Sequence, residues 1–268
     1  MSWATTLLSG PRNLGRSRGF RVTISDKIVV ITGAGSGLGR ALAMGFVQRG
    51  ATVIGLGRRD ASLSETGSLI GNNRFSRHAV DVSEAESVTK VVEAIVEQFG
   101  RIDVLINSAA VYPKISFLEQ DAESWMKTIA INLGGVANCC RAVLPLMIRQ
   151  GRGRIINVGS FADRAPIPSS SAYAASKGGL RALTKAIGAD LGEAYPDITC
   201  FEWIPGHLNT QMSNFTGMDP AVCVDWALQI ISLPTGGPNA MIFLGDHEYV
   251  PIKSLRSRVK EKLMFWRR

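Results

Sequence analysis

The sequence predicts an α/β fold, a doubly wound parallel sheet in a three-layer αβα arrangement, and three observations support this. Short apolar segments alternate along the chain with segments of helical periodicity. The apolar segments lack polar alternation, as in a parallel sheet whose crossover helices cover both faces. With 268 residues, the chain is long enough for one large domain and too short for two ordinary domains with linkers.

The N-terminal half begins with a strand, a turn and a helix. Residues 27–32 form an apolar run that ends in glycines, a helix is expected at 40–48, and a second strand at 52–56. Ser83 and Glu86 have the spacing of a capping box, and apolar residues then recur at helical spacing as far as Gly100. We therefore expect a helix before Gly100, with a third strand preceding it.

The C-terminal half continues the same alternation. Asp121 is the expected start of a helix that runs through Trp125 and Ile129. Further helices are expected at 174–191 and 219–233, and further strands at 103–107, 154–158, 199–203 and 240–244. No internal repeat or linker is visible, so residues 26–252 are expected to form a single domain.

The positive charge of the chain lies at its two ends. The formal net charge is +8, but residues 1–25 hold four arginines without an acid, and residues 253–268 hold seven basic residues and one acid. The domain between them is slightly acidic, which argues against a nucleic-acid partner. The N-terminal extension has the composition of a mitochondrial transit peptide, although Pro11 and three glycines favour a disordered extension, so a cytoplasmic location is expected.

The basic C-terminal segment has an amphipathic pattern, with Leu255, Val259, Leu263 and Trp266 on one helical face. This pattern suits peripheral contact with an anionic membrane or a subunit contact, and a solvated tail is the plain alternative. No apolar run approaches the length of a membrane-spanning helix. The four cysteines lack metal or disulfide spacing, so we expect buried thiols in a reducing compartment and no metal site.

The turn after the first strand has a phosphate-binding pattern, because residues 32–39 read T-G-x-x-x-G-x-G. Glycines at Gly33, Gly37 and Gly39 let backbone N–H groups and a helix N-terminus face a pyrophosphate, although a tight turn without a ligand is the alternative. About 20 residues on, where an acid usually holds the ribose hydroxyl, Arg58 and Arg59 occur instead. Guanidinium groups suit a ribose 2′-phosphate, so NADP(H) is the expected cofactor, with two solvated arginines as the alternative.

Tyr173 and Lys177 begin the long helix four residues apart, so both side chains project from one face. An ammonium about 5 Å from a phenol stabilises the phenolate by about 3 kcal/mol, which would lower the tyrosine pKa by roughly two pH units. Such a tyrosine exchanges protons with an alcohol or carbonyl. Ser160 ends the preceding strand, and Asn132 lies in a helix, whose interior disfavours asparagine.

Together these residues resemble the short-chain dehydrogenase/reductase family. The resemblance runs from about Asp26 to Pro251 and also includes Asn107–Ala110 and Pro205-Gly206 with Thr210. It implies a Rossmann-type domain that transfers hydride between NADP(H) and a small-molecule carbonyl or alcohol, as a homodimer or homotetramer. A cofactor-binding regulator or a membrane-recruited scaffold of the same fold is the alternative function.

The resemblance also implies a role for each site residue. Tyr173 would be the acid/base, Lys177 would hold the nicotinamide ribose and lower the tyrosine pKa, Ser160 would position the substrate oxygen, and Asn132 would fix a water. Asn107 would support the sheet near the cofactor. The implied cofactor-binding residues are Gly33, Ser36, Gly37, Leu38, Gly39, Arg58, Arg59, Asp81, Val82, Asn107, Ala109, Tyr173, Lys177, Pro205, Gly206 and Thr210.

Two departures from the family pattern bear on the pocket. Ala110 stands where the family has glycine, which would tighten the wall beside the cofactor, and the stretch 206–219 is short for a substrate cover, which would leave the pocket open. The substrate pocket is expected near 110–115, 163–168 and 207–215 and names no substrate. For His207, a loop histidine without a role is favoured over one that borders the substrate. Trp203 is expected in the core, and residues 233–238 resemble a carbonyl-reductase-type branch more weakly.

Overall fold

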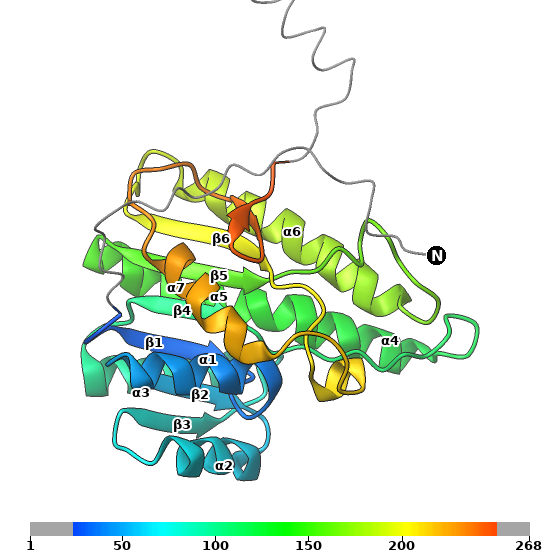
Figure 1. The fold of residues 1–268 in the computed structure, drawn as a ribbon. Coiled ribbons are helices and arrows are strands. Elements are labelled where there is room, and N and C mark those ends of the chain that lie inside the picture. The colour runs from blue at the N-terminus through cyan, green and yellow to red at the C-terminus, as the bar shows by residue number, and fades with distance from the viewer. Residues whose placement is uncertain (1–23, 251–268) are drawn as a thin grey trace, which may run out of the picture.

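The computed structural model describes residues 24–250, and these form one α/β domain around a single sheet (Figure 1). The strand order is β3-β2-β1-β4-β5-β6-β7-β8, and every neighbouring pair is parallel except β7 with β8. Helices cover both faces, which confirms the predicted doubly wound, Rossmann-type fold of three layers. The tail predicted at 253–268 and almost all of the extension predicted at 1–25 lie outside the described residues.

The parallel strands bring their carboxyl ends to one edge of the sheet. They are β1 (Ile28–Thr32), β2 (Thr52–Gly57), β3 (Phe75–Ala79), β4 (Val104–Asn107), β5 (Gly153–Val158), β6 (Ile198–Ile204) and β7 (Ile242–Leu244), whereas β8 (His247–Glu248) runs in the opposite direction. β1 pairs with β2 on one side and with β4 on the other, so the winding of the chain reverses at β1. In open α/β sheets, ligands bind in the crevice at such a reversal.

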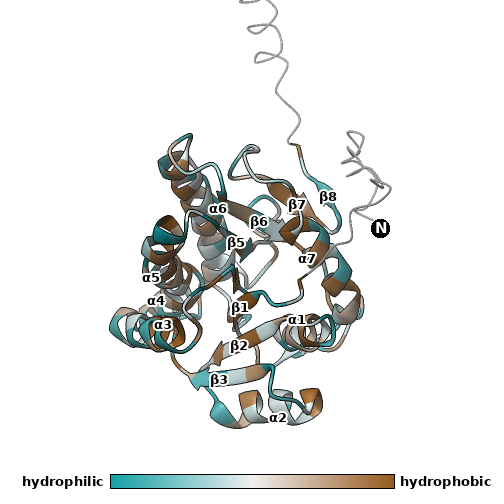
Figure 2. Ribbon diagram, turned by 90° about the vertical axis from the view of Figure 1, so that its left-hand side faces the viewer, coloured by the Kyte–Doolittle hydropathy of each residue, from teal (hydrophilic) through white to brown (hydrophobic). Residues whose placement is uncertain are grey.

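Two layers of helices enclose the sheet. The helices are α1 (Gly37–Gln48), α2 (Asp60–Ile70), α3 (Ala85–Phe99), α4 (Ala122–Ile129), α5 (Gly135–Gln150), α6 (Ser171–Leu191) and α7 (Cys223–Ile231). Figure 2 shows α3, α4, α5 and α6 on one side of the sheet and α1 and α7 on the other. A π-helical turn, Ala130–Gly134, joins α4 to α5, and 3₁₀ turns lie at Gln211–Ser213 and Pro220–Val222.

The hydrophobic core is divided by the sheet into two clusters. In β1, Val29 and Ile31 pack in the cluster that contains α1 and α7, whereas Ile28 and Val30 pack in the cluster that contains α3 and α5. Trp203 is fully buried in the first cluster, which confirms its predicted core position. The four cysteines are buried free thiols, as expected. Ile24, which falls within the range predicted as an extension, is buried in the first cluster as well.

Several helix boundaries differ from the predicted ones. The capping box predicted at Ser83 and Glu86 is wrong: α3 begins at Ala85, and the Ser83 hydroxyl donates to the Asp81 carboxylate at 2.7 Å. The start at Asp121 is confirmed, because its carboxylate accepts from the Ser124 N–H at 2.7 Å. The helix after it runs through Trp125 and Ile129, as predicted, and continues through the π-helical turn and α5 to residue 150.

That continuous helix, residues 122–150, is apolar and long enough to cross a membrane by length and composition alone. The sequence had indicated that no such run exists, because glycine, asparagine and arginine interrupt it. Half of its most apolar window is buried inside the protein, and α5 and α4 pack against α3 and α6 respectively. We therefore regard it as a core helix of the domain.

Candidate active site

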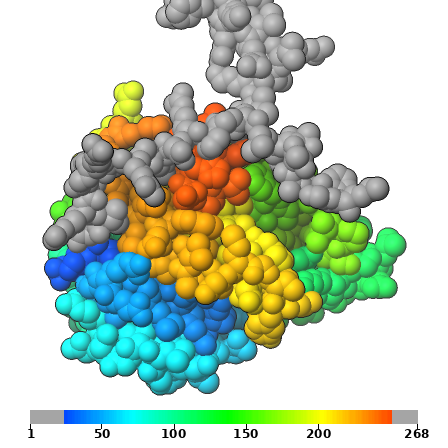
Figure 3. Space-filling model, in the orientation of Figure 1, coloured from blue at the N-terminus to red at the C-terminus, as the bar shows by residue number. Residues whose placement is uncertain are grey.

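A cleft of about 1750 Å³ lies at the carboxyl ends of the central strands. Its walls come from the turn after β1 and from the segments that follow β2, β4, β5 and β6. The segment after β6, yellow in Figure 3, lies beside the blue α1, and the Thr210 methyl would be 3.1 Å from a Cβ placed on Gly37. All three ranges predicted for the substrate pocket contribute to the cleft lining.

The turn between β1 and α1 is built so that only glycine fits at its close approaches. Gly33 has a left-handed φ of +72°, and a Cβ there would lie 3.0 Å from the Cα of Ala109. A Cβ on Gly39 would lie 2.3 Å from the carbonyl oxygen of Gly33. Helix α1 starts at Gly37, and its N-cap Ser36 makes no side-chain cap. The start of α1 therefore suits an anionic group such as a pyrophosphate.

An arginine that sequence reasoning missed holds this turn against α2. The Arg40 guanidinium donates to the Gly35 carbonyl at 2.6 Å, to Thr66 at 3.1 Å and to both carboxylate oxygens of Glu65. The Thr66 hydroxyl in turn donates to the Ala34 carbonyl at 3.0 Å. The only signal in the sequence is that Arg40 occupies a position where the ordinary dinucleotide fingerprint counted from Gly35 would have glycine.

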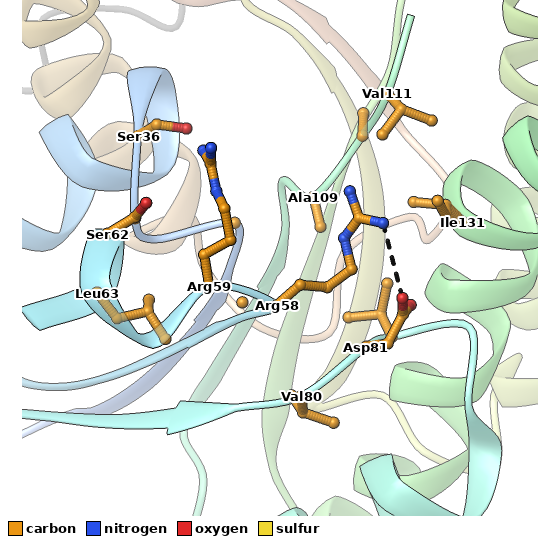
Figure 4. A pocket seen from close by; sticks show the side chains of 15 residues that line it. Ser36, Arg58, Arg59, Ser62, Leu63, Val80, Asp81, Ala109, Val111 and Ile131 are labelled. Atoms are coloured by element: carbon orange, nitrogen blue, oxygen red, sulfur yellow. Dashed lines mark ion pairs between the residues drawn. The ribbon is translucent and has the colours of Figure 1, made fainter.

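Two arginines follow β2 at one end of the cleft (Figure 4). Arg59 extends toward Ser36, and Arg58 extends toward Asp81, with 3.8 Å between its Nη1 and the carboxylate Oδ2. Burial acts to raise the pKa of Asp81, but hydrogen bonds from Ser83 and the charge of Arg58 outweigh it and leave that pKa below its usual value. Across residues 24–250, no hydrogen bond or ion pair engages the Arg59 side chain. Ser62, which also lines this end, carried no signal in the sequence.

The segment after β4 forms the opposite wall. The Thr32 hydroxyl accepts from the N–H groups of Ser108 and Ala109, both at 3.0 Å, and so fixes this segment beside the phosphate turn. Asn107 is buried under the cleft and donates to Asn157 of β5 at 2.8 Å. Asn107 thus supports the sheet, as expected, without forming part of the cleft wall.

Tyr173 and Lys177 lie together in the first turns of α6. The Lys177 Nζ is 5.6 Å from the centroid of the tyrosine ring and donates to the Val158 carbonyl at 2.7 Å. The tyrosine ring stacks on Tyr112, with 4.7 Å between centroids. Ser160 follows β5 and lines the same part of the cleft. The structure therefore brings together three of the four predicted catalytic side chains.

The predicted direction of the tyrosine pKa is wrong. Burial raises the pKa of Tyr173, and the hydrogen bond with Ser160, which lowers it, does not compensate. Burial also disfavours the charged form of the amine. It lowers the pKa of Lys177 to about 8, although the negative charge of Glu202 acts to raise that pKa. The predicted decrease in the tyrosine pKa treats the pair as partly solvated and omits the free energy that is needed to bury a charged group.

Asn132 lies in the π-helical turn and is fully buried. Its side chain accepts from the Val111 N–H at 2.8 Å and donates to the Val111 carbonyl at 2.9 Å and to Ser176 at 3.1 Å. These hydrogen bonds hold the segment after β4, and the role expected for Asn132 in fixing a water stays a prediction. Asn132 acts on the wall of the cleft.

The substrate end of the cleft has mixed walls. Besides the predicted ranges, α4 contributes Lys127 and Thr128 to the lining. Sequence reasoning missed both because neither belongs to a recognisable motif. His207 lines the cleft and its Nε2 lies 2.9 Å from the Thr216 hydroxyl. Lys114 donates to Asn214 at 3.4 Å, so the walls meet at the mouth despite the short segment after β6. Within the described residues, no group of three metal-ligating side chains occurs.

Comparisons with known proteins agree with this geometry. A family model described as short chain dehydrogenase matches residues 27–220. An uncharacterised oxidoreductase of Staphylococcus saprophyticus is 32% identical over 223 residues, covering 80% of this chain and 94% of the relative. A 3-oxoacyl-[acyl-carrier-protein] reductase of Thermotoga maritima is 34% identical, covering 71% of this chain and 77% of the relative. The crystal structure of a 3-ketoacyl-(acyl-carrier-protein) reductase from Brucella melitensis complexed with NADH has a TM-score of 0.74 and 25% identity, covering 83% and 97% of the two chains.

Proposed function

The chain belongs to the short-chain dehydrogenase family, and on that premise we propose that it is an NADP(H)-dependent oxidoreductase that interconverts a ketone or aldehyde and an alcohol. The observation that carries this proposal is the meeting of Tyr173, Lys177 and Ser160 in one cleft with the glycine turn after β1. The bound cofactor would supply or accept the hydride. The chain itself would bind the dinucleotide, orient the substrate and move one proton.

Each side chain has a defined task in the proposed reaction. The Ser160 hydroxyl would donate a hydrogen bond to the substrate oxygen and hold it near the Tyr173 hydroxyl. Burial raises the pKa of Tyr173, so the phenol holds its proton at neutral pH, and this is the proton that would pass to a carbonyl oxygen. The Lys177 amine, with its pKa lowered to about 8, is mostly an ammonium at neutral pH and would favour the phenolate that remains. This protonation state supports reduction as the favoured direction.

The proposed preference for NADP(H) depends on Arg58 and Arg59. Both line the end of the cleft next to the phosphate turn, and Arg59 projects toward Ser36 (Figure 4). The acid nearest to them, Asp81, is paired with Arg58. A relative of the same fold binds NADH, so the preference is supported by the charge of these two side chains and not by the family.

A screen of NADPH oxidation over aldehydes, ketones, quinones and steroids tests the proposal, with Tyr173→Phe as the control. General acid catalysis typically contributes about 10²–10⁴-fold, so the variant should lose at least about 10²-fold in kcat and still bind NADPH. A regulator that only senses NADP(H) would keep its function after the substitution. Failure of every carbonyl class to consume NADPH would overturn the proposal.

We propose a homodimer or homotetramer and a cytoplasmic location, and sedimentation equilibrium and cell fractionation measure these directly. We also propose that residues 253–268 contact anionic membranes, because of their basic and amphipathic pattern. If deletion of this segment leaves sedimentation with acidic liposomes unchanged, the membrane contact is wrong.

A further inference from the structure

Four charged side chains form a buried cluster directly behind the proposed catalytic residues. The Arg181 guanidinium donates to the two carboxylate oxygens of Glu202 at 2.8 and 2.9 Å and also to Asp163. The Arg181 and Glu202 side chains are 7% and 1% exposed. Lys177 lies one helical turn before Arg181 on α6 and is equally buried. No step of the proposed reaction uses Arg181, Glu202 or Asp163.

Members of the cluster contact the backbone on which Ser160 lies. Lys177 donates to the carbonyl of Val158, and Arg181 donates to the carbonyl of Ser160 at 3.0 Å. Between them, Gly159 packs on the Glu202 carboxylate so closely that a Cβ there would lie 2.3 Å from its Oε1. Three consecutive residues are thus contacted by three members of the cluster. The position of the Ser160 hydroxyl therefore depends on side chains of α6 and β6.

The charges of the cluster balance only in one protonation state of Lys177. Arg181 carries one positive charge, and Glu202 and Asp163 each carry one negative charge when paired as observed. An ammonium on Lys177 makes the buried sum zero, and loss of its proton leaves an uncompensated negative charge. Tyr173 lies beside Lys177, and Tyr112 stacks on the Tyr173 ring; both phenols are neutral at pH 7.

We propose that Arg181, Glu202 and Asp163 are positioning residues of the active site, which fix the backbone at Ser160 and keep the Lys177 amine charged. The catalytic role of these residues rests on the proposed function, whereas their effects on the Ser160 backbone and on the Lys177 charge rest on the observed contacts. In line with it, burial lowers the pKa of Lys177 to about 8 and the charge of Glu202 acts against that fall. A buried ion pair contributes little to the net stability of a fold, because desolvation of its charges offsets their attraction. The presence of the pair here is therefore better explained by a role in the active site than by a role in stability.

The proposal predicts opposite effects from two neutralising substitutions. Glu202→Gln removes a negative charge, so the Lys177 proton is released more readily and the upper limb of the pH–rate profile moves to lower pH. Arg181→Met removes a positive charge, so the same limb moves to higher pH. Each shift should be about one pH unit, as for a buried neighbour of opposite or like sign. The double variant Arg181→Met/Glu202→Gln should return the limb toward that of the wild type.

Three measurements separate this role from a merely structural one. In the cofactor-free protein, NMR of ¹³C-labelled lysines should show the same opposite shifts in the titration of Lys177, whose resonance is assigned with Lys177→Arg. In steady-state assays, Arg181→Met should lower kcat about tenfold and change NADPH binding less than about twofold, because the phosphate turn is held separately by Arg40. Arg154→Met, which removes another buried arginine, should lower the unfolding temperature without moving the pH limb.

The outcomes discriminate clearly. If Arg181→Met does not fold, the step from Glu202→Gln to the double variant still removes one positive charge and must move the Lys177 titration to higher pH. Shifts of the same sign in both single variants, or none in either, would overturn the proposal. If the wild-type protein reduces no carbonyl, the proposed function fails, whereas the NMR titration of Lys177 still decides the inference.

Discussion

Substitution of Arg59 by alanine should convert a preference for NADPH into near indifference between the two nicotinamide cofactors. Arg59 is the better of the two arginines to change, because the charge of Arg58 is shared with Asp81 at 3.8 Å. The Arg59 side chain instead extends along the cleft toward the start of α1, where the phosphates are proposed to lie (Figure 4). Loss of Arg59 removes a donor from the 2′-phosphate and leaves the phosphate turn intact.

The magnitude follows from the energy of a charge-assisted hydrogen bond. One such bond contributes about 1.5–3 kcal/mol, which corresponds to roughly a 10- to 150-fold decrease in kcat/KM for NADPH. NADH has no 2′-phosphate, so its kcat/KM should change less than about threefold. The effect is electrostatic and partly exposed to solvent, so the preference of the wild type should shrink as ionic strength rises.

The assay is NADPH and NADH oxidation at saturating carbonyl substrate, from which the ratio of the two kcat/KM values is taken. Arg141→Ala is the matched control, because it removes the same charge from an exposed position on α5 that does not line the cleft. An equal loss with both cofactors in Arg59→Ala would show that the side chain acts on folding or on the turn. A wild-type ratio that favours NADH would refute the reasoning at its start.

Further predictions concern pH, stability and the phosphate turn. Because burial lowers the pKa of Lys177 to about 8, the ammonium dominates below that pH, so the rate of carbonyl reduction should fall as pH rises through about 8; a rate that climbs from pH 7 to 10 contradicts this. Arg154→Met should reduce the free energy of unfolding in urea by about 2–4 kcal/mol, because three carbonyls at the end of α7 lose their buried donor; no change in the urea midpoint contradicts it. Gly39→Ala should weaken NADPH binding by at least about tenfold in a fluorescence titration, since the new Cβ would lie 2.3 Å from the Gly33 carbonyl oxygen. The control variant Gly237→Ala should bind NADPH normally, because a Cβ there has no neighbour within 4 Å.

The sequence predicted those parts of the fold whose signal is local. β1 and the turn after it combine a fully buried apolar run with glycines that the backbone requires, so both could be placed. The bounds of β3 could not, because its residues are half exposed and it is a strand only through its pairing with β2. The capping box predicted at Ser83 was wrong because another contact competes for its hydroxyl, which donates to the Asp81 carboxylate instead of capping the helix.

The helix from 122 to 150 shows how tertiary contacts override a local breaker. Glycine disfavours the interior of a helix, yet α5 begins at Gly135 directly after the π-helical turn, and a Cβ there would lie 2.4 Å from the Val82 side chain. Gly135 thus serves close packing between α5 and the segment after β3. A single sequence does not distinguish a glycine that ends a helix from one that admits a neighbour.

For the candidate site, motif spacing located the residues but not their electrostatics. The four-residue spacing of Tyr173 and Lys177 correctly placed them on one face. The sign of the pKa change at the tyrosine depends on how deeply the pair is buried, which no spacing reveals. Arg181 and Glu202 meet across 21 residues of sequence and through two different elements, so neither could be associated with the site before the fold was known.

The π-helical turn at Ala130–Gly134 has a consequence for how this chain tolerates length changes. Each residue of an α-helix advances the side chains by about 100° around its axis, so a wide turn acts as a phase shift between α4 and α5. Removal of one residue from a regular part of α4 would rotate α5 by that angle and turn Cys139 and Cys140 out of the core, whereas removal within the π-helical turn can be absorbed by closing it to an ordinary α-helical turn. Closing the turn in this way would move the Asn132 amide away from Val111, so the extra residue serves the wall of the cleft and not the packing of α5.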